Sequence, residues 1–190
     1  MDCSSFVNFN FIDSRITSER MMFPERRQVA SILVLNPVGK AICLAMSEKA
    51  EQDGRLNLSP LQGGIEKNES LYSAVIREVR EEVGVGVSGK VLYIGSAVRT
   101  LGPDHKRRNQ FKEYHHHWVV TFADSHTLSP QPPLQSADWY YFDTLVSICH
   151  SMSEAKRQMF QGALASVYGI SGDRQLVRRE AINDARQTMA

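Results

Sequence analysis

Residues 63–85 constrain the fold of this chain more than any other segment. They read Gly-Gly-Ile-Glu-Lys-Asn-Glu-Ser-Leu-Tyr-Ser-Ala-Val-Ile-Arg-Glu-Val-Arg-Glu-Glu-Val-Gly-Val. The two glycines at the start permit backbone conformations that other residues avoid, which suits a tight loop. Asn68 and Ser70 are both suited to cap a helix, no Gly or Pro interrupts residues 70–83, and Gly84 follows where a helix commonly ends. The segment therefore predicts a glycine loop that leads into one helix.

The predicted helix carries two neighbouring stripes of side chains, because consecutive residues lie about 100° apart around its axis. The apolar stripe consists of Tyr72, Val75, Ile76, Val79 and Val83. The acidic stripe consists of Glu78, Glu81 and Glu82. Glu78 and Glu82 are like charges four residues apart, which costs about 0.2–0.5 kcal/mol in an isolated helix. They also lie near the negative end of the helix dipole. A divalent cation would reverse both effects, since Mg²⁺ binds carboxylate oxygens together with substrate phosphates.

The acidic stripe has a second interpretation, a solvated face held by ion pairs such as Arg77 with Glu81. The preceding glycines and the spacing of the charged residues favour the metal site. The fixed positions are Gly63, Glu69, Arg77-Glu78, Glu81-Glu82 and Gly84, which is the spacing of the Nudix box. The chain therefore resembles the Nudix hydrolases, enzymes that cleave the diphosphate linkage of nucleoside-diphosphate derivatives with Mg²⁺ or Mn²⁺.

This resemblance implies a role for each residue of the box. Glu78, Glu81 and Glu82 would be metal ligands, joined by a backbone carbonyl of Gln62 or Gly63. Glu69 and Arg77 would pair to hold the loop against the helix, and Gly84 would end the helix. Glu81 or Glu82 is our choice of general base. The implied fold is an α/β/α sandwich around a mixed sheet.

Residues 26–166 resemble one branch of the family, the bacterial RNA pyrophosphohydrolases and dinucleoside-polyphosphate hydrolases. Arg27-Gln28-Val29-Ala30-Ser31-Ile32 and Gln62-Gly63-Gly64-Ile65 carry this resemblance. The substrate would then be a dinucleoside polyphosphate or a 5′-triphosphorylated RNA end.

Three departures separate the chain from that branch. Leu58-Ser59-Pro60-Leu61 replaces Trp-Gln-Phe-Pro, and Ala45-Met46-Ser47 stands where the branch tends to carry arginines. Gln135 falls near the place of a further glutamate ligand, for which Glu113 is the alternative.

The length of 190 residues suggests one domain with a modest extension. We expect an N-terminal arm (1–25), a Nudix domain (26–168) and a C-terminal helical tail (169–190).

The net charge of +1 gives no general attraction to nucleic acid or membranes. The three cysteines lack metal-ligand spacing and indicate free thiols in a reducing compartment, with Cys43 in the core. No secretory signal or run of about 20 apolar residues is present, so we expect a soluble, cytoplasmic protein without a membrane partner. A homodimer is one possible assembly.

The remaining chain predicts strands alternating with a few helices, with helices covering both faces of the sheet. The expected strands are Val29–Leu35 and Ala41–Met46, joined as a hairpin, then Val91–Val98, Phe111–Phe122 and Asp138–Phe142. The expected helices beyond the box cover residues 152–167 and 173–189.

Two sets of cations are candidates for substrate phosphates. Arg27 matches a family position near the phosphates, although it equally fits a surface arginine at a strand start. Lys106 and Arg107 belong to a basic loop, which is more often simply solvated.

Two further groups have a functional and a structural interpretation. His115 and His117 share one face of a strand and would suit a transition metal, but ordinary strand packing is favoured. Trp139 and Tyr140 would suit base stacking, but core packing is again favoured.

The leading functional hypothesis is a metal-dependent pyrophosphohydrolase acting on a nucleotide or a nucleotide-capped end. One alternative is a housecleaning pyrophosphatase for nucleoside triphosphates or ADP-ribose. Another is a nucleotide sensor without turnover, which the complete set of three carboxylates disfavours. A plain α/β scaffold with an exposed acidic helix is the remaining possibility.

Overall fold

The computed structural model of the chain describes residues 25–47, 58–103, 107, 109–141, 144–145, 148, 157 and 160–164. The predicted N-terminal arm, the last helix and most of the predicted helix 152–167 lie outside these ranges, as does the boundary predicted at residue 168. Among the described residues, no helix is both long and apolar enough to cross a membrane.

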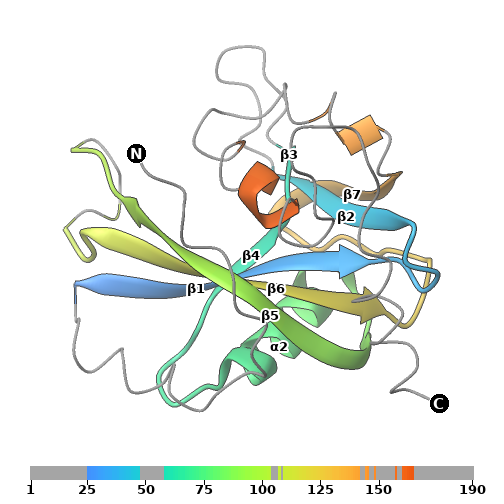
Figure 1. The fold of residues 1–190 in the computed structure, drawn as a ribbon, viewed down its shortest axis with the longest axis horizontal. Helices are drawn as coiled ribbons and strands as arrows, with labels where there is room; N and C mark the ends of the chain where they lie inside the picture. Colours follow the sequence, from blue (N-terminus) through green and yellow to red (C-terminus); the bar gives the residue numbers. More distant parts are fainter. Residues whose placement is uncertain are drawn as a thin grey trace.

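The described residues form a mixed seven-stranded sheet (Figure 1). Its strands are β1 (Arg26–Leu35), β2 (Ala41–Ser47), β3 (Leu58–Ser59), β4 (Leu61–Gly64), β5 (Val87–Thr100), β6 (Glu113–Ala123) and β7 (Leu134–Tyr141). The order is β3-β2-β1-β6-β5, while β4 also pairs with β1 and β7 with β2. The β1–β6 pair is parallel and the other pairs are antiparallel. The helix α2 (Leu71–Val83) follows β4.

Strand β1 lies at the centre of the sheet because its aliphatic run is buried on both faces. It begins at Arg26, three residues earlier than predicted, and pairs with β6 along its whole length. The predicted hairpin of β1 and β2 exists, but the two strands are in register only at Leu35 and Ile42. Strand β2 then pairs with β7 over its full length, which extends the predicted aromatic strand back to Leu134.

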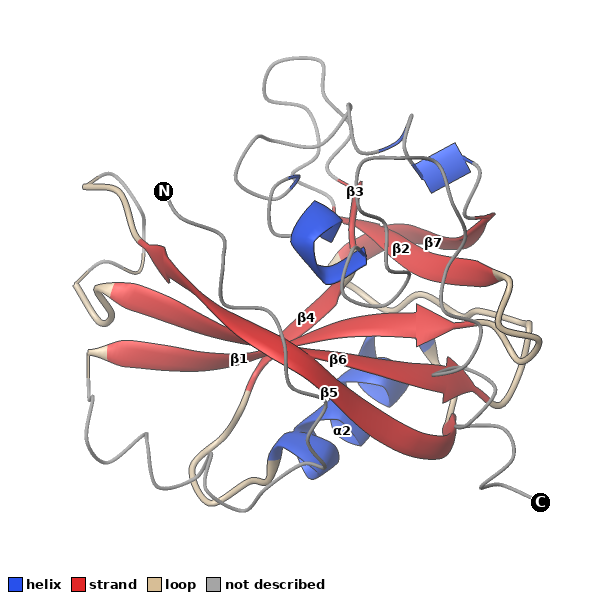
Figure 2. Ribbon diagram, viewed as in Figure 1, coloured by secondary structure: helices blue, strands red, loops and turns tan. Residues whose placement is uncertain are grey.

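Two apolar cores lie on opposite faces of the sheet, because successive residues of β1 alternate between them. One core contains Leu33 and Leu35 and packs against the helical residues 160–164. The other contains Ile32 and Val34 and packs against α2. Figure 2 shows α2 on one side of the sheet and the short helical segment on the other. The predicted arrangement with helices on both faces is therefore present.

Three side chains with predicted core positions can be placed. Cys43 is fully buried, and burial raises the pKa of its thiol to about 12, so it stays neutral. Trp139 and Tyr140 are half-buried and pack against opposite cores, as the packing interpretation predicted. The Trp139 indole donates to the His126 carbonyl at 2.7 Å, which satisfies its polar end.

The apolar stripe of α2 differs from the prediction at one edge. Tyr72 is 45% exposed, and Ile76 is only half-buried. The buried side chains are Leu71, Ala74, Val75, Val79 and Val83. The helix is therefore rotated so that Leu71 and Ala74 face the sheet and Tyr72 faces outward.

Candidate active site

The helix α2 is fixed at both ends by its own sequence. Ser70, rather than Asn68, is the N-cap, and its hydroxyl accepts a hydrogen bond from Ser73 N at 3.0 Å. Gly84 ends the helix in the left-handed conformation with φ of 70°, and its N–H donates to Arg80 O at 3.0 Å. The box glycine thus has the conformational role expected at a helix C-terminus.

The loop 124–134 also holds the C-terminal turn of α2, and the sequence patterns did not reveal this. Ser129 N donates to Val83 O at 2.8 Å, and Gln131 N donates to Glu82 O at 2.9 Å. The Gln131 side chain in turn donates to the Ser129 carbonyl at 2.9 Å. These bonds satisfy carbonyls that a helix end leaves without an internal donor, and they fix the backbone of Glu82.

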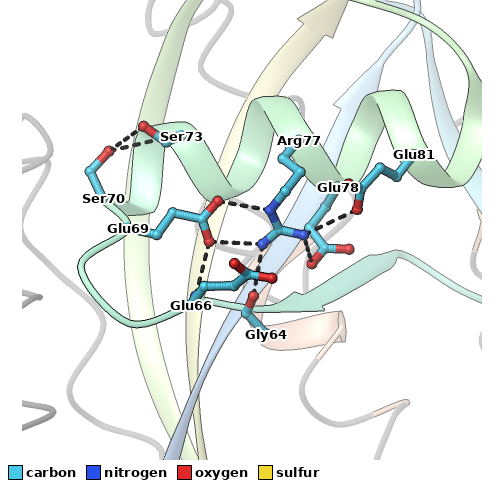
Figure 3. A network of polar contacts seen from close by, with 8 residues as sticks. All are labelled: Gly64, Glu66, Glu69, Ser70, Ser73, Arg77, Glu78 and Glu81. Carbon is cyan, nitrogen blue, oxygen red and sulfur yellow. Dashed lines mark hydrogen bonds and ion pairs between the residues drawn. The ribbon is translucent and has the colours of Figure 1, made fainter.

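Arg77 is the centre of the polar network between α2 and the preceding loop (Figure 3). Its Nε and Nη2 donate to the two Glu69 carboxylate oxygens, both at 2.8 Å, which is a bidentate pair. Nη2 also donates to Gly64 O at 2.9 Å, while Nη1 donates to Glu78 at 2.6 Å and Glu81 at 3.2 Å. The Arg77 guanidinium lowers the pKa of the Glu69 carboxyl. The ion pair expected from the family resemblance is therefore present, and Arg77 contacts two of the three acidic-stripe residues as well.

Strand β4 turns alternate backbone groups toward α2. Ile65 N donates to Gln28 O at 3.0 Å, which makes residues 28 and 65 a hydrogen-bonded pair. In an antiparallel ladder such pairs alternate with pairs whose polar groups point away from the partner strand. By the register of β1 and β4, Gln62 and Gly64 belong to the second kind. Gly64 O meets Arg77, and the Gln62 N–H meets the Glu82 carboxylate. The Gln62 carbonyl points the same way as its N–H, toward the acidic stripe.

Glu78 and Glu82 lie in the space between α2 and β4. A Cβ atom at Gly63 would coincide with the Glu78 carboxyl group, so only glycine leaves room for it. Burial raises the pKa of Glu78 against the opposing effect of Arg77. Burial is the main cause that raises the pKa of Glu82 to about 8, and the charge of Glu78 adds to it. The hydrogen bond from the Gln62 N–H lowers this pKa, and the charge of Glu81 raises it. A buried carboxylate with two acidic neighbours is destabilised unless a positive charge compensates it.

The three carboxylates are not gathered into a ready metal cage. Among the described residues, no group of three or more His, Cys, Asp or Glu side chains is arranged to hold a metal ion. Glu78 and Glu81 share Arg77 Nη1, whereas Glu82 accepts from Gln62 on the other side. Mutual repulsion separates like charges, and Arg77 is the cation that two of them contact. The Glu81 side chain is 60% exposed.

The remaining candidates occupy different places. Arg27 lies against the box, because a Cβ at Gly64 would be 2.6 Å from Arg27 Nη2. Arg107 is half-buried, and Lys106 lies outside the described residues. Gln135 is exposed on β7. Glu113 accepts from Arg26 at 2.9 Å, so this alternative ligand is held by an arginine of β1.

The histidine run of β6 is buried between neighbouring strands. His117 Nε2 and Gln28 Oε1 are 2.6 Å apart, and the rings of His115 and His117 are 4.4 Å apart. His116 lies on the other face, with its Nδ1 at 2.9 Å from Ser31 Oγ. These contacts support the strand-packing interpretation.

The fold and the site together define an α/β protein in which a carboxylate-bearing helix faces a glycine strand. Residues 25–162 match the family model described as the NUDIX domain. The chain therefore belongs to the Nudix family. It is a Nudix pyrophosphohydrolase, a hydrolase of phosphorus-containing acid anhydrides. Members of this family generally use a divalent metal such as Mg²⁺ or Mn²⁺ and act on small nucleotide substrates.

Solved structures with the same fold include three bacterial proteins. A NUDIX-family hydrolase from Clostridium perfringens is 21% identical, with a TM-score of 0.53 over 72% of this chain and 95% of its own. The E. coli dihydroneopterin triphosphate pyrophosphohydrolase is 12% identical, with a TM-score of 0.55 and coverage of 70% and 92%. A NUDIX hydrolase from Nitrosomonas europaea is 17% identical, with a TM-score of 0.55 and coverage of 74% and 89%. At these identities the likeness concerns the fold alone. No curated protein matches the sequence significantly.

Proposed function

We propose that the protein uses Mg²⁺ or Mn²⁺ to hydrolyse the diphosphate linkage of a nucleoside-diphosphate derivative, preferably a dinucleoside polyphosphate or a 5′-triphosphorylated RNA end. The observation that carries this proposal is that the Glu78 and Glu82 carboxylates of α2 lie against the polar edge of β4, with Glu81 beside them on Arg77. Glu82 is partly buried there with two acidic neighbours, and a divalent cation would compensate that charge.

The donors fit a hard divalent cation. Glu78, Glu81 and Glu82 supply carboxylate oxygens, and Gln62 supplies a backbone carbonyl directed to the same side. Mg²⁺ commonly takes only one or two carboxylates plus waters and substrate phosphates, so a complete protein cage is not required. When bound, such an ion neutralises phosphate oxygens and lowers the pKa of coordinated water.

The other residues position this set. Arg77 ties Glu69 and Gly64 to α2 and keeps the end of β4, where a glycine loop was predicted, against the helix. Gly63 provides the space for the Glu78 carboxylate. Glu81 or Glu82 accepts the proton of the attacking water as general base, and the exposure of the Glu81 side chain suits that role. Arg27, and in the basic loop Lys106 and Arg107, contact the substrate phosphates.

The substrate preference rests on the resemblance of residues 26–166 to the RNA pyrophosphohydrolase branch. Arg27 at the start of β1 supports it, because its guanidinium lies against the box. A second candidate substrate is a triphosphate derivative, the class on which the E. coli neighbour, a dihydroneopterin triphosphate pyrophosphohydrolase, acts. ADP-ribose is a further candidate substrate.

The test is turnover by the purified protein with Mg²⁺ and with Mn²⁺. The substrates are diadenosine tetraphosphate, nucleoside triphosphates, ADP-ribose, NADH and triphosphorylated RNA. Glu82→Gln should reduce turnover about 100-fold or more, since it removes a charged metal ligand. Glu25→Gln, at an exposed glutamate paired with Lys112, is the matched control and should retain full activity. Full activity of Glu82→Gln, or no turnover with either metal, would refute the proposal, and binding without turnover would indicate a sensor.

A further inference from the structure

An arginine, a tyrosine and a second arginine lie in one row across three strands. Arg27 of β1 is the register partner of Tyr114 of β6, and Tyr114 is the partner of Arg99 of β5. Register partners project from the same face of a sheet, and neighbouring strands are about 4.8 Å apart. The Cα atoms of Arg27 and Arg99 are therefore about 10 Å apart, with the tyrosine ring between them.

This Arg27–Tyr114–Arg99 row lies on the face of the sheet opposite α2. Tyr114 and His116 alternate with His115 and His117 along β6, and Trp118, two residues further, belongs to the core on that face. The charge of Arg99 reaches His116, which agrees with their position on one face. All three residues of the row are half-buried.

Tyr114 holds Arg27 in place. The Arg27 guanidinium carbon is 5.6 Å from the centre of the Tyr114 ring, within the range of a cation–π contact. The ring itself is braced at its edge by Phe111, with ring centres 6.5 Å apart. An arginine packed in this way loses less conformational freedom when it binds an anion than one that is free in solvent.

Neither arginine of the row is paired with a carboxylate among the described residues. The ion pairs at this end of the sheet use other cations, Arg26 with Glu113 and Lys112 with Glu25. Two half-buried guanidinium groups on one face therefore lack a protein anion within the described part of the chain. Arginine groups bind phosphate oxygens by paired hydrogen bonds, so a phosphate of the substrate is an anion that fits them.

The row begins beside the acidic stripe. The Arg27 guanidinium lies against Gly64, and the Glu78 carboxylate lies against Gly63, on opposite faces of β4. A phosphate chain that crosses the edge of β4 would contact the carboxylate site at one end and Arg27 at the other.

We propose that Arg27 and Arg99 form a clamp for a phosphate beyond the cleaved linkage, with Tyr114 as the positioning residue of Arg27. This inference rests on the proposed function. It defines the substrate as one with three or more linked phosphates, such as a dinucleoside tetraphosphate or a triphosphorylated end. ADP-ribose, with two phosphates flanked by sugars, has no group for the clamp.

Binding of inorganic tripolyphosphate in EDTA tests the clamp without metal and without hydrolysis. Calorimetry should show binding about 10-fold weaker for Arg99→Ala than for the unmodified protein, because a charge-assisted contact is lost. Arg99→Lys keeps the positive charge but not the paired N–H donors of the guanidinium, so it should recover only part of the affinity for tripolyphosphate. Lys40→Ala removes an equal charge from an exposed turn and should bind normally. Equal binding by the unmodified protein and Arg99→Ala, or equal weakening by Lys40→Ala, would overturn the proposal.

The kinetic test compares two substrates in the same variants with Mg²⁺. Arg99→Ala should lower kcat/KM for diadenosine tetraphosphate about 10-fold, mainly through KM, and leave any ADP-ribose hydrolysis nearly unchanged. An equal loss on both substrates would overturn the clamp. Tyr114→Phe keeps the ring over Arg27 and should keep most of the kcat/KM for diadenosine tetraphosphate. Tyr114→Ala and Arg27→Ala should both lower this kcat/KM, because each leaves the clamp without a positioned Arg27. If the protein hydrolyses nothing but Arg99→Ala still weakens tripolyphosphate binding, the clamp is supported and the enzymatic proposal fails.

Discussion

Gly63 is the residue at which the box depends most directly on the absence of a side chain. A Cβ at this position would coincide with the Glu78 carboxyl group. Gly63→Ala should therefore expel that carboxylate from the gap between α2 and β4 while leaving the buried face of the helix intact. We expect the Mg²⁺ concentration for half-maximal activity to rise about 10- to 100-fold, the range seen when the surroundings that orient a metal ligand are changed. A metal titration of turnover measures it.

Gly102→Ala is the matched control for this substitution. No atom lies within 4 Å of a Cβ built at Gly102. The same chemical change there should alter neither the metal dependence nor the melting temperature. An unchanged metal titration in Gly63→Ala would mean that Glu78 does not need its observed position.

At the scale of a single element, Gly84 decides how α2 ends. Its φ of 70° is strained for a residue with a side chain, and a Cβ would lie 2.9 Å from Ser129 Cβ. Gly84→Ala should destabilise the protein by about 1–2 kcal/mol from backbone strain, with a further cost from the contact. For a chain of this size each kcal/mol lowers Tm by about 2–4 °C, which thermal unfolding measures. Ser129→Gly in the same background should restore the part due to the contact, and a Tm unchanged from the unmodified protein would contradict this account.

The same helix shows what the sequence could and could not predict. Its limits and its C-terminal glycine follow from local spacing, which one segment contains in full. The spacing left Asn68 and Ser70 as alternative N-caps, and the pairing of Glu69 with Arg77 follows from the family resemblance. The outward position of Tyr72 does not, because the rotation of α2 is set by packing against a sheet assembled from distant strands. The bonds from Ser129 and Gln131 to the end of the helix join residues more than 40 positions apart and leave no periodic signal. Nor does the sequence pair Arg27 with Tyr114, since that contact needs the parallel register of β1 and β6.

At the scale of the whole molecule, the parallel contact of β1 and β6 buries histidines at the centre of the sheet. His116 and His117 are each 2% exposed. Burial is the main cause that lowers their pKa, to about 4 for His116 and about 3 for His117, and the neighbouring Arg99 and His115 act in the same direction. Both rings are therefore neutral in the folded protein at pH 7, whereas in the unfolded chain they titrate near a pKa of about 6.5.

Acid should therefore destabilise the folded protein, because His116 and His117 are buried without charge at the centre of the sheet. Between about pH 6.5 and the lower folded values these two histidines bind more protons in the unfolded chain, so their contribution to the free energy of unfolding falls as the pH falls. The raised pKa of Glu82 acts in the opposite direction and makes the net slope smaller. The contribution of the two histidines is fully present above pH 6.5, and its loss approaches about 1.4 kcal/mol per pH unit for each histidine below that. Urea unfolding at pH 7, 6, 5 and 4.5 measures the slope. His117→Gln, which stays neutral beside Gln28, should make it shallower, whereas His126→Gln at an exposed loop position should not. A His117→Gln slope equal to that of the unmodified protein would assign the acid sensitivity to other groups.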